Sequence, residues 1–126
     1  MNAARRLVPA WLLTGLPGAQ RAAAIAHCLA QVPAAARVSL LLEGASADEP
    51  KPGATGALRV HVLAPGCPCC IGNLTLRVTL ARVLQQEDPQ VLIMAIVDAS
   101  HRLRLARLLG QLPWDGWLEL QAAPTD

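Results

Sequence analysis

Three cysteines within four consecutive positions are the residues best suited to chemistry in this chain of 126 residues. Cys67, Cys69 and Cys70 follow Gly66, and Pro68 separates the first two. Thiols this close in sequence cannot all pack into one apolar core, and thiolates are soft metal ligands as well as redox nucleophiles. The cluster therefore predicts a transition-metal site, with Zn²⁺ the preferred ion, or a thiol–disulfide centre.

Three thiolates around a tetrahedral ion leave one coordination position for another ligand. Glu43, His61 and His101 are the candidates in the sequence, besides water or a group from a partner. Because an open position suits transfer of a metal better than its permanent retention, we expect a site that passes its ion on. The redox alternative depends on the Cys-x-x-Cys spacing of Cys67 and Cys70, without other thioredoxin-like features in the chain.

A glycine-bearing segment near the N-terminus is the second candidate for chemistry. Phosphate-binding loops have the pattern Gly-x-x-x-x-Gly-Lys-[Ser/Thr]: backbone N–H groups surround the phosphates, the lysine reaches the outer phosphates and the hydroxyl holds Mg²⁺. Here Gly15 and Gly18 are present, but Gln20 replaces the second required glycine, Arg21 the lysine and Ala22 the hydroxyl residue. Since phosphoryl transfer needs the metal and the positioned charge together, we expect no efficient GTP hydrolysis.

Together, the two loops resemble those of the CobW-like branch of the P-loop GTPases, which includes metal chaperones. That family has Thr-Gly-x-x-Gly-x-Gly-Lys-Thr-Thr after its first strand and Gly-Cys-x-Cys-Cys between a later strand and a helix. Residues 14–23 and 66–70 stand in the corresponding frames, and the resemblance covers roughly residues 9–97. It implies a P-loop fold, a metal site at the cysteines and a degenerate site for GTP and Mg²⁺ at Gly15, Gly18 and Arg21.

The chain departs from this family in several places. The guanine-reading Asn-Lys-x-Asp motif is missing, because Lys51 is the only lysine and lies in an unrelated stretch. Glu43 stands nearest to the glutamate of the family's Asn-Glu-x-Gly. Asp98 lacks the family's Glu-Thr-Thr-Gly setting, so we expect no Mg²⁺-coupled role for it. The family's second, C-terminal domain is also missing, so we expect a shortened form.

Apolar periodicity indicates the elements that position these loops. The patterns of strands occur at residues 10–14, 38–42, 58–62, 91–97 and 117–121, and helical spacing occurs at 25–32, 74–85 and 100–109. In the helix after the cysteines, Leu74, Val78 and Ala81 are expected to face the sheet. Because strands and helices alternate, the expected fold class is α/β: a three-layer, P-loop-like, mostly parallel sheet with helices on both faces, shortened at its C-terminus.

Length and composition favour one domain over residues 1–126, with an ordered core at about 9–121 and a surface loop at 44–56. Hydrophobic residues make up 53% of the chain and aromatic residues 2%, so the core must consist mainly of Ala, Leu, Val and Ile. A net charge of +2 and few aromatic residues do not favour a nucleic-acid partner.

The expected location is the cytoplasm, because clustered cysteines do not form a disulfide framework. The apolar stretch after Arg5 and Arg6 is broken by Pro9, Gly15 and Pro17, so we expect neither a signal peptide nor a membrane partner. Cys28 lies on the apolar side of its helix and is expected to be a buried structural thiol.

These features predict a metal-binding accessory protein rather than an enzyme. Its expected partners are a metal ion and a client metalloprotein or a full-length relative of the CobW-like family. Three alternatives stay open: an active or weakly active GTP-binding metallochaperone, a thiol redox protein, and a dimerisation or adaptor module in which Zn²⁺ bridges two copies.

Overall fold

The computed structural model describes residues 7–16, 18–44, 53–55, 57–63, 71–97, 99–111 and 114–121. Its strands are β1 (Val8–Thr14), β2 (Val38–Glu43), β3 (Gly53–Thr55), β4 (Leu58–Leu63), β5 (Val91–Ile96) and β6 (Leu118–Leu120). Its helices are α1 (Gly18–Ala30), α2 (Ile71–Gln86) and α3 (Arg102–Leu109), with short 3₁₀ turns at Ala99–His101 and Trp114–Gly116.

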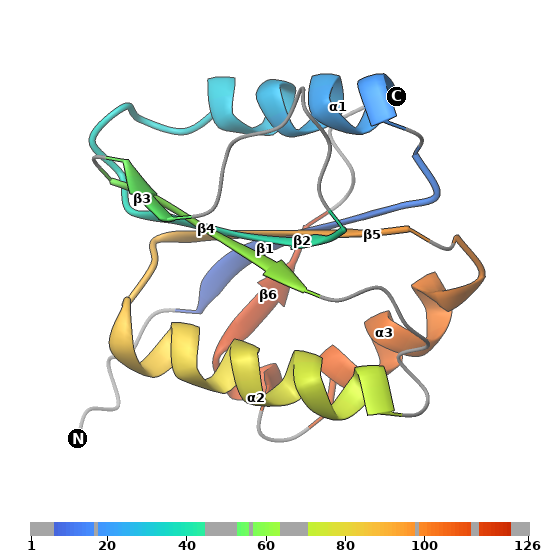
Figure 1. The fold of residues 1–126 in the computed structure, drawn as a ribbon. Coiled ribbons are helices and arrows are strands. Elements are labelled where there is room, and N and C mark those ends of the chain that lie inside the picture. The colour runs from blue at the N-terminus through green and yellow to red at the C-terminus, as the bar shows by residue number, and fades with distance from the viewer. Residues whose placement is uncertain are drawn as a thin grey trace.

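The strands form one sheet in the order β3-β4-β2-β5-β1-β6. All pairings are parallel except that of β3, which runs antiparallel to β4. Figure 1 shows α1 over one face of the sheet and α2 and α3 over the other. The expected α/β class, with a mostly parallel sheet between helices, is therefore confirmed.

The core lies on both faces of the two central strands. Every residue of β2 is buried, and so are five of the six residues of β5, from Leu92 to Ile96. Since successive side chains of a strand point to opposite faces, Leu40 and Leu42 pack with α1, whereas Leu41 packs with α2 and α3. A continuous apolar run is the pattern that burial on two faces requires, which is why these strands were predictable from the sequence.

The expectation for the buried face of α2 was wrong in part. Val78, expected to face the sheet, is 51% exposed, while Ala81 is partly buried against the core as expected. Among the described side chains of α2, those of the core are Leu76, Leu80, Val83 and Leu84; the side chain of Leu74 lies outside the described residues. The observed helical phase buries Leu80 rather than the smaller Val78, and burial of more apolar area favours this phase among those that the spacing allows.

The segment expected to be a surface loop, residues 44–56, contains a short strand. Gly53–Thr55 pairs with β4, with Ala54 opposite Arg59. This pairing supplies partners to backbone groups at an edge of the parallel sheet, which is a general reason for adding a strand there. No helix in the described part of the chain combines the length and the hydropathy that a membrane span requires.

Candidate functional site

The predicted phosphate loop lies at the carboxyl edge of the sheet. At this point the connections that follow two neighbouring strands leave toward opposite faces of the sheet. β1 and β5 pair side by side. The chain leaves β1 toward α1 on one face and leaves β5 toward α3 on the other (Figure 1). Ligands of open α/β sheets bind at such a switch point, so the topology places residues 15–16 and 18–21 where a ligand site is expected.

Gly15 is required by the packing of the chain itself. Its φ is +73°, a left-handed conformation that favours glycine. Its N–H donates to the carbonyl of Ile96 at 3.2 Å. A Cβ at this position would lie 2.6 Å from the Cβ of Ala99. The turn after β1 therefore packs directly on the segment after β5, and this contact explains the glycine without any ligand.

Gly18, the first residue of α1, has no comparable structural requirement. It is exposed, and a Cβ added to it would meet no described atom within 4 Å. In a phosphate loop, a glycine without a steric role in the protein lets the backbone approach the ligand closely. Substituting Gly18 therefore tests for a binding role, because a larger residue at this position should not disturb the described structure.

Arg21, the fourth residue of α1, is only 6% exposed. Its Nη1 donates to the carbonyl of Glu43 and its Nη2 to the carbonyl of Gly44, both at 2.8 Å. The planar guanidinium matches two adjacent acceptors in a way that a lysine ammonium would not. The residue in the place of the phosphate-loop lysine thus braces α1 against the end of β2.

Glu43, the last residue of β2, is 7% exposed. Its Oε1 accepts a hydrogen bond from the backbone N–H of Val97 at 2.8 Å, which links the carboxyl ends of β2 and β5. The sequence shows Glu43 as a single acid that closes an apolar run, but it does not show this backbone partner. As a metal ligand, Glu43 would have to act with its carboxylate already bound to Val97.

His61 on β4 contacts a carboxylate that sequence reasoning missed. Its Nε2 lies 2.6 Å from Oε2 of Glu87, a close polar contact without the alignment of a hydrogen bond. Oε1 of Glu87 accepts a hydrogen bond from Ser39 Oγ at 2.8 Å. Glu87 follows the end of α2 and Ser39 is the second residue of β2, so the carboxylate lies against the imidazole from the amino end of the sheet. The metal-binding role of His61 stays a prediction.

The cysteine cluster lies outside the described residues: Cys67, Cys69 and Cys70 are not described, nor are Asp98 and the side chain of His101. The described neighbours of the cluster are Leu63, which ends β4, and Ile71, which begins α2. The carbonyl of Leu63 accepts a hydrogen bond from the N–H of Gly44 at 2.9 Å, so the chain leaves β4 beside the segment that Arg21 braces. Within the described residues, no group of three or more His, Cys, Asp or Glu could hold a metal ion.

Cys28 is fully buried in α1, as expected. Burial raises the pKa of its thiol above the ordinary value, because desolvation disfavours the thiolate. Since the thiolate is the nucleophile and the metal ligand, Cys28 is unsuited to either role in the folded protein.

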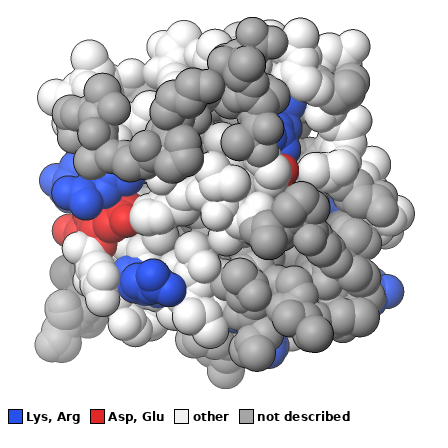
Figure 2. Space-filling view, in the orientation of Figure 1, with Lys and Arg blue, Asp and Glu red and all other residues white. Residues whose placement is uncertain are grey.

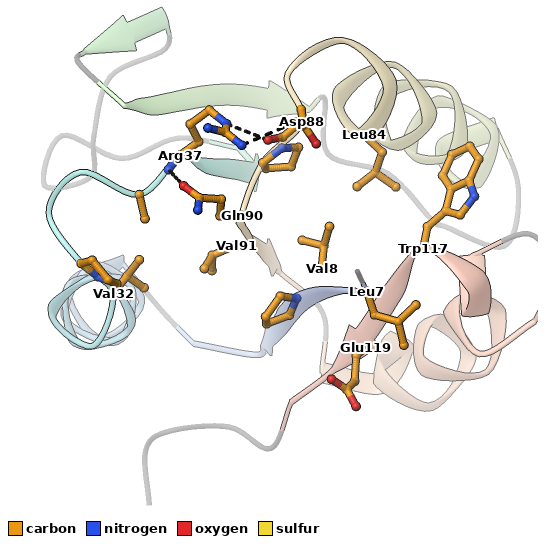
Figure 3. A pocket seen from close by; sticks show the side chains of 14 residues that line it. Leu7, Val8, Val32, Arg37, Leu84, Asp88, Gln90, Val91, Trp117 and Glu119 are labelled. Carbon is orange, nitrogen blue, oxygen red and sulfur yellow. Dashed lines mark hydrogen bonds and ion pairs between the residues drawn. The ribbon is translucent and has the colours of Figure 1, made fainter. Parts of the chain in front are cut away.

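A groove of about 930 Å³ lies at the opposite, amino edge of the sheet. Figure 3 shows apolar side chains such as Val8 and Trp117 along its walls, with Arg37, Asp88 and Gln90 on its rim. The rim groups bind one another: Arg37 Nε donates to the carbonyl of Asp88 at 2.8 Å, and the N–H of Arg37 donates to Gln90 Oε1 at 2.9 Å. The described candidates among the predicted site residues, namely Gly15, Gly18, Arg21, Glu43 and His61, do not line this groove, so its size alone does not make it the site.

The described residues bring Gly15, Arg21 and Glu43 to one edge of the sheet, in contacts that hold the edge together. His61 lies on the adjoining strand and contacts Glu87 instead. Comparisons of the chain with family models, curated proteins and solved structures find no match.

Proposed function

We propose that this protein is a metal-binding accessory protein with a P-loop-like domain, similar in design to CobW-like metal chaperones. It binds Zn²⁺ or a similar transition-metal ion through Cys67, Cys69 and Cys70, and it does not hydrolyse GTP efficiently. One contrast carries the proposal. Arg21, in the place of the phosphate-loop lysine, is buried on two carbonyls of its own chain, whereas all three thiols of the other motif are kept.

The nucleotide side of the proposal follows from the cost of releasing Arg21. Hydrogen bonds from a charged donor contribute about 1.5–3 kcal/mol each, so turning the guanidinium toward a phosphate would sacrifice about 3–6 kcal/mol. That loss corresponds to about two to four orders of magnitude in affinity. Ala22 also offers no hydroxyl for Mg²⁺. The fold supports the shape of a phosphate loop without the charge and metal that phosphoryl transfer needs.

The metal side of the proposal follows from the donor set. Three thiolates suit Zn²⁺ and leave one tetrahedral position. Glu43 and His61 already contact Val97 and Glu87, respectively, which favours water or a client's ligand at the fourth position. The ion is then cargo, held loosely enough for a client metalloprotein or a full-length relative in the cytoplasm to take it by ligand exchange.

Metal analysis combined with a nucleotide titration tests the proposal. Protein purified anaerobically under reducing conditions is titrated with Co²⁺, whose thiolate absorption bands report sulfur ligation, and then with competing Zn²⁺. We expect saturable binding in the wild type and in a Cys28→Ala control, and loss of binding in Cys67→Ser. A fluorescent GTP analogue with Mg²⁺ should show no saturable binding.

Each other outcome identifies a different function. Absence of metal binding, or an unchanged Cys67→Ser variant, contradicts the proposal. Saturable GTP binding that Arg21→Ala abolishes favours the GTPase. A change in molecular mass on chelation favours a Zn²⁺-bridged dimer, and a reversible disulfide between Cys67 and Cys70 without metal binding favours the redox protein.

A further inference from the structure

The outward surface of α2 and α3 carries positive charge only. Both helices pack on the same face of the sheet (Figure 1). Neither residues 71–86 nor residues 99–111 contain Asp or Glu. Figure 2 shows blue patches and no red one in the lowest part of the view, where these helices lie. The exposed arginines of the two helices that concern us are Arg77, Arg82, Arg104 and Arg107.

These arginines differ from the arginines that brace the fold. Arg21 and Arg102 each bind backbone carbonyls; Arg102 Nη1 donates to the carbonyl of Leu12 at 3.1 Å. In the described part of the chain, by contrast, no ion pair or side-chain hydrogen bond involves Arg77, Arg82, Arg104 or Arg107. No described contact within the domain accounts for this concentration of like charge.

Among the described side chains, each helix also exposes one large apolar residue between two of its arginines. On α2, Val78 is 51% exposed and lies beside Arg77 and one turn before Arg82. On α3, Leu103 is 76% exposed and lies beside Arg104 and one turn before Arg107. Residues four apart share one face of a helix, so Arg82 lies on the side of α2 that carries Val78, and Arg107 lies on the side of α3 that carries Leu103. We call these six exposed residues, on two helices that cover the same face of the sheet, the basic face.

We propose that the basic face docks an acidic segment of a partner protein, one in which apolar side chains stand between carboxylates. Guanidinium groups pair with carboxylates through two parallel hydrogen bonds, and apolar groups of the segment would cover Val78 and Leu103. Phosphates of a nucleic acid would leave these two side chains uncovered. A membrane needs a longer apolar stripe than one side chain on each of two helices. The surface and the metal site are independent features.

Peptide binding measured by fluorescence anisotropy tests this inference. The probe is a short fluorescein-labelled peptide of repeating Glu-Glu-Leu, and the matched peptide has Gln in place of Glu. The double variant Arg104→Gln/Arg107→Gln removes two charges from the basic face. Its control, Ala23→Glu/Ala26→Glu, changes the net charge equally on exposed positions of α1. Circular dichroism and metal binding of both variants report whether the fold is kept.

We expect the Glu peptide to bind the wild type and the α1 control alike, and to bind the α3 double variant about fivefold to thirtyfold more weakly. Leu103→Ser should also weaken binding, whereas the Gln peptide should not bind. The inference is overturned if both double variants weaken binding equally, if the peptide does not bind, or if anionic lipid vesicles or duplex DNA bind more tightly than the peptide. Loss of metal binding in Cys67→Ser with unchanged peptide affinity would show that the two sites are separate.

Discussion

Replacing Arg21 by alanine should lower the free energy of unfolding by about 3 kcal/mol. The wild-type side chain makes two hydrogen bonds from a charged donor, each at 2.8 Å, to the carbonyls of Glu43 and Gly44. Such bonds contribute about 1.5–3 kcal/mol each. Two effects reduce the sum: the bond to Gly44 is only partly buried, so water can replace it, and the variant does not immobilise a long side chain, which returns about 1–2 kcal/mol.

Arg21→Lys distinguishes a brace from an anion site. An ammonium keeps the charge but cannot hold both carbonyls with a planar fork, so we expect a loss of about 1–2 kcal/mol. Lysine is also the residue that phosphate-binding loops have at this position, and because Ala22 remains, GTP binding should not appear. If Arg21 served an anion, the two substitutions would change anion binding and leave the stability of the free protein nearly unchanged.

Urea unfolding followed by tryptophan fluorescence measures these differences, because Trp114 is buried and reports loss of the core. A decrease of 3 kcal/mol corresponds to a fall of about 10 °C in Tm for a chain of this size. The control is Arg104→Ala on the exposed side of α3, which should stay within about 0.5 kcal/mol of the wild type. An Arg21→Ala variant as stable as this control would refute the assignment of Arg21 as a brace.

Three further predictions concern Gly15 and Gly18, Cys28, and Glu87. Gly15→Ala should destabilise the fold by about 2 kcal/mol or more, because residue 15 has a positive φ and its added Cβ would clash with Ala99. Gly18→Ala should be neutral or slightly stabilising, because its added Cβ meets no described atom. Urea unfolding of the two variants measures both effects. Above pH 9.0 the Cys28 thiol of the unfolded chain ionises, whereas the buried thiol of the folded chain keeps its proton. The free energy of unfolding should therefore fall as the pH rises above this value. The Cys28→Ala variant should lose less free energy of unfolding than the wild type over the same pH range. Glu87→Ala should cost about 1–3 kcal/mol, because the buried Ser39 hydroxyl loses its acceptor; an unchanged unfolding midpoint would contradict this pairing.

Much of the fold was predictable because its signals are local. The apolar run of β2 and the alternation of β4 determine strands within a few residues, and Gly110 follows α3 directly, as the sequence predicts. Which side of α2 is buried was harder to predict. Val78 and Leu80 both satisfy helical spacing, and the choice between them depends on which set of side chains fills the space beneath the helix.

The contacts of the candidate site were not predictable, because they join residues far apart in the chain. Arg21 and Glu43 both stood out in the sequence, but only the parallel pairing of β2 and β5 places the carbonyl of Glu43 beside α1 and its carboxylate beside Val97. Likewise, His61 was a candidate ligand by type, while its contact with Glu87 depends on where α2 ends over the sheet. Spacing identified the reactive residue types, and tertiary structure determined their partners.

The brace formed by Arg21 has a thermodynamic consequence for the proposed role. If Arg21 stays bound to the carbonyls of Glu43 and Gly44, as the structure shows, a carrier that does not hydrolyse GTP would have no external source of free energy with which to eject its cargo. Delivery can then proceed only downhill, toward a recipient that holds the ion more tightly. The direction of metal flow would be determined by a ladder of affinities among the proteins involved, rather than by a cycle of hydrolysis.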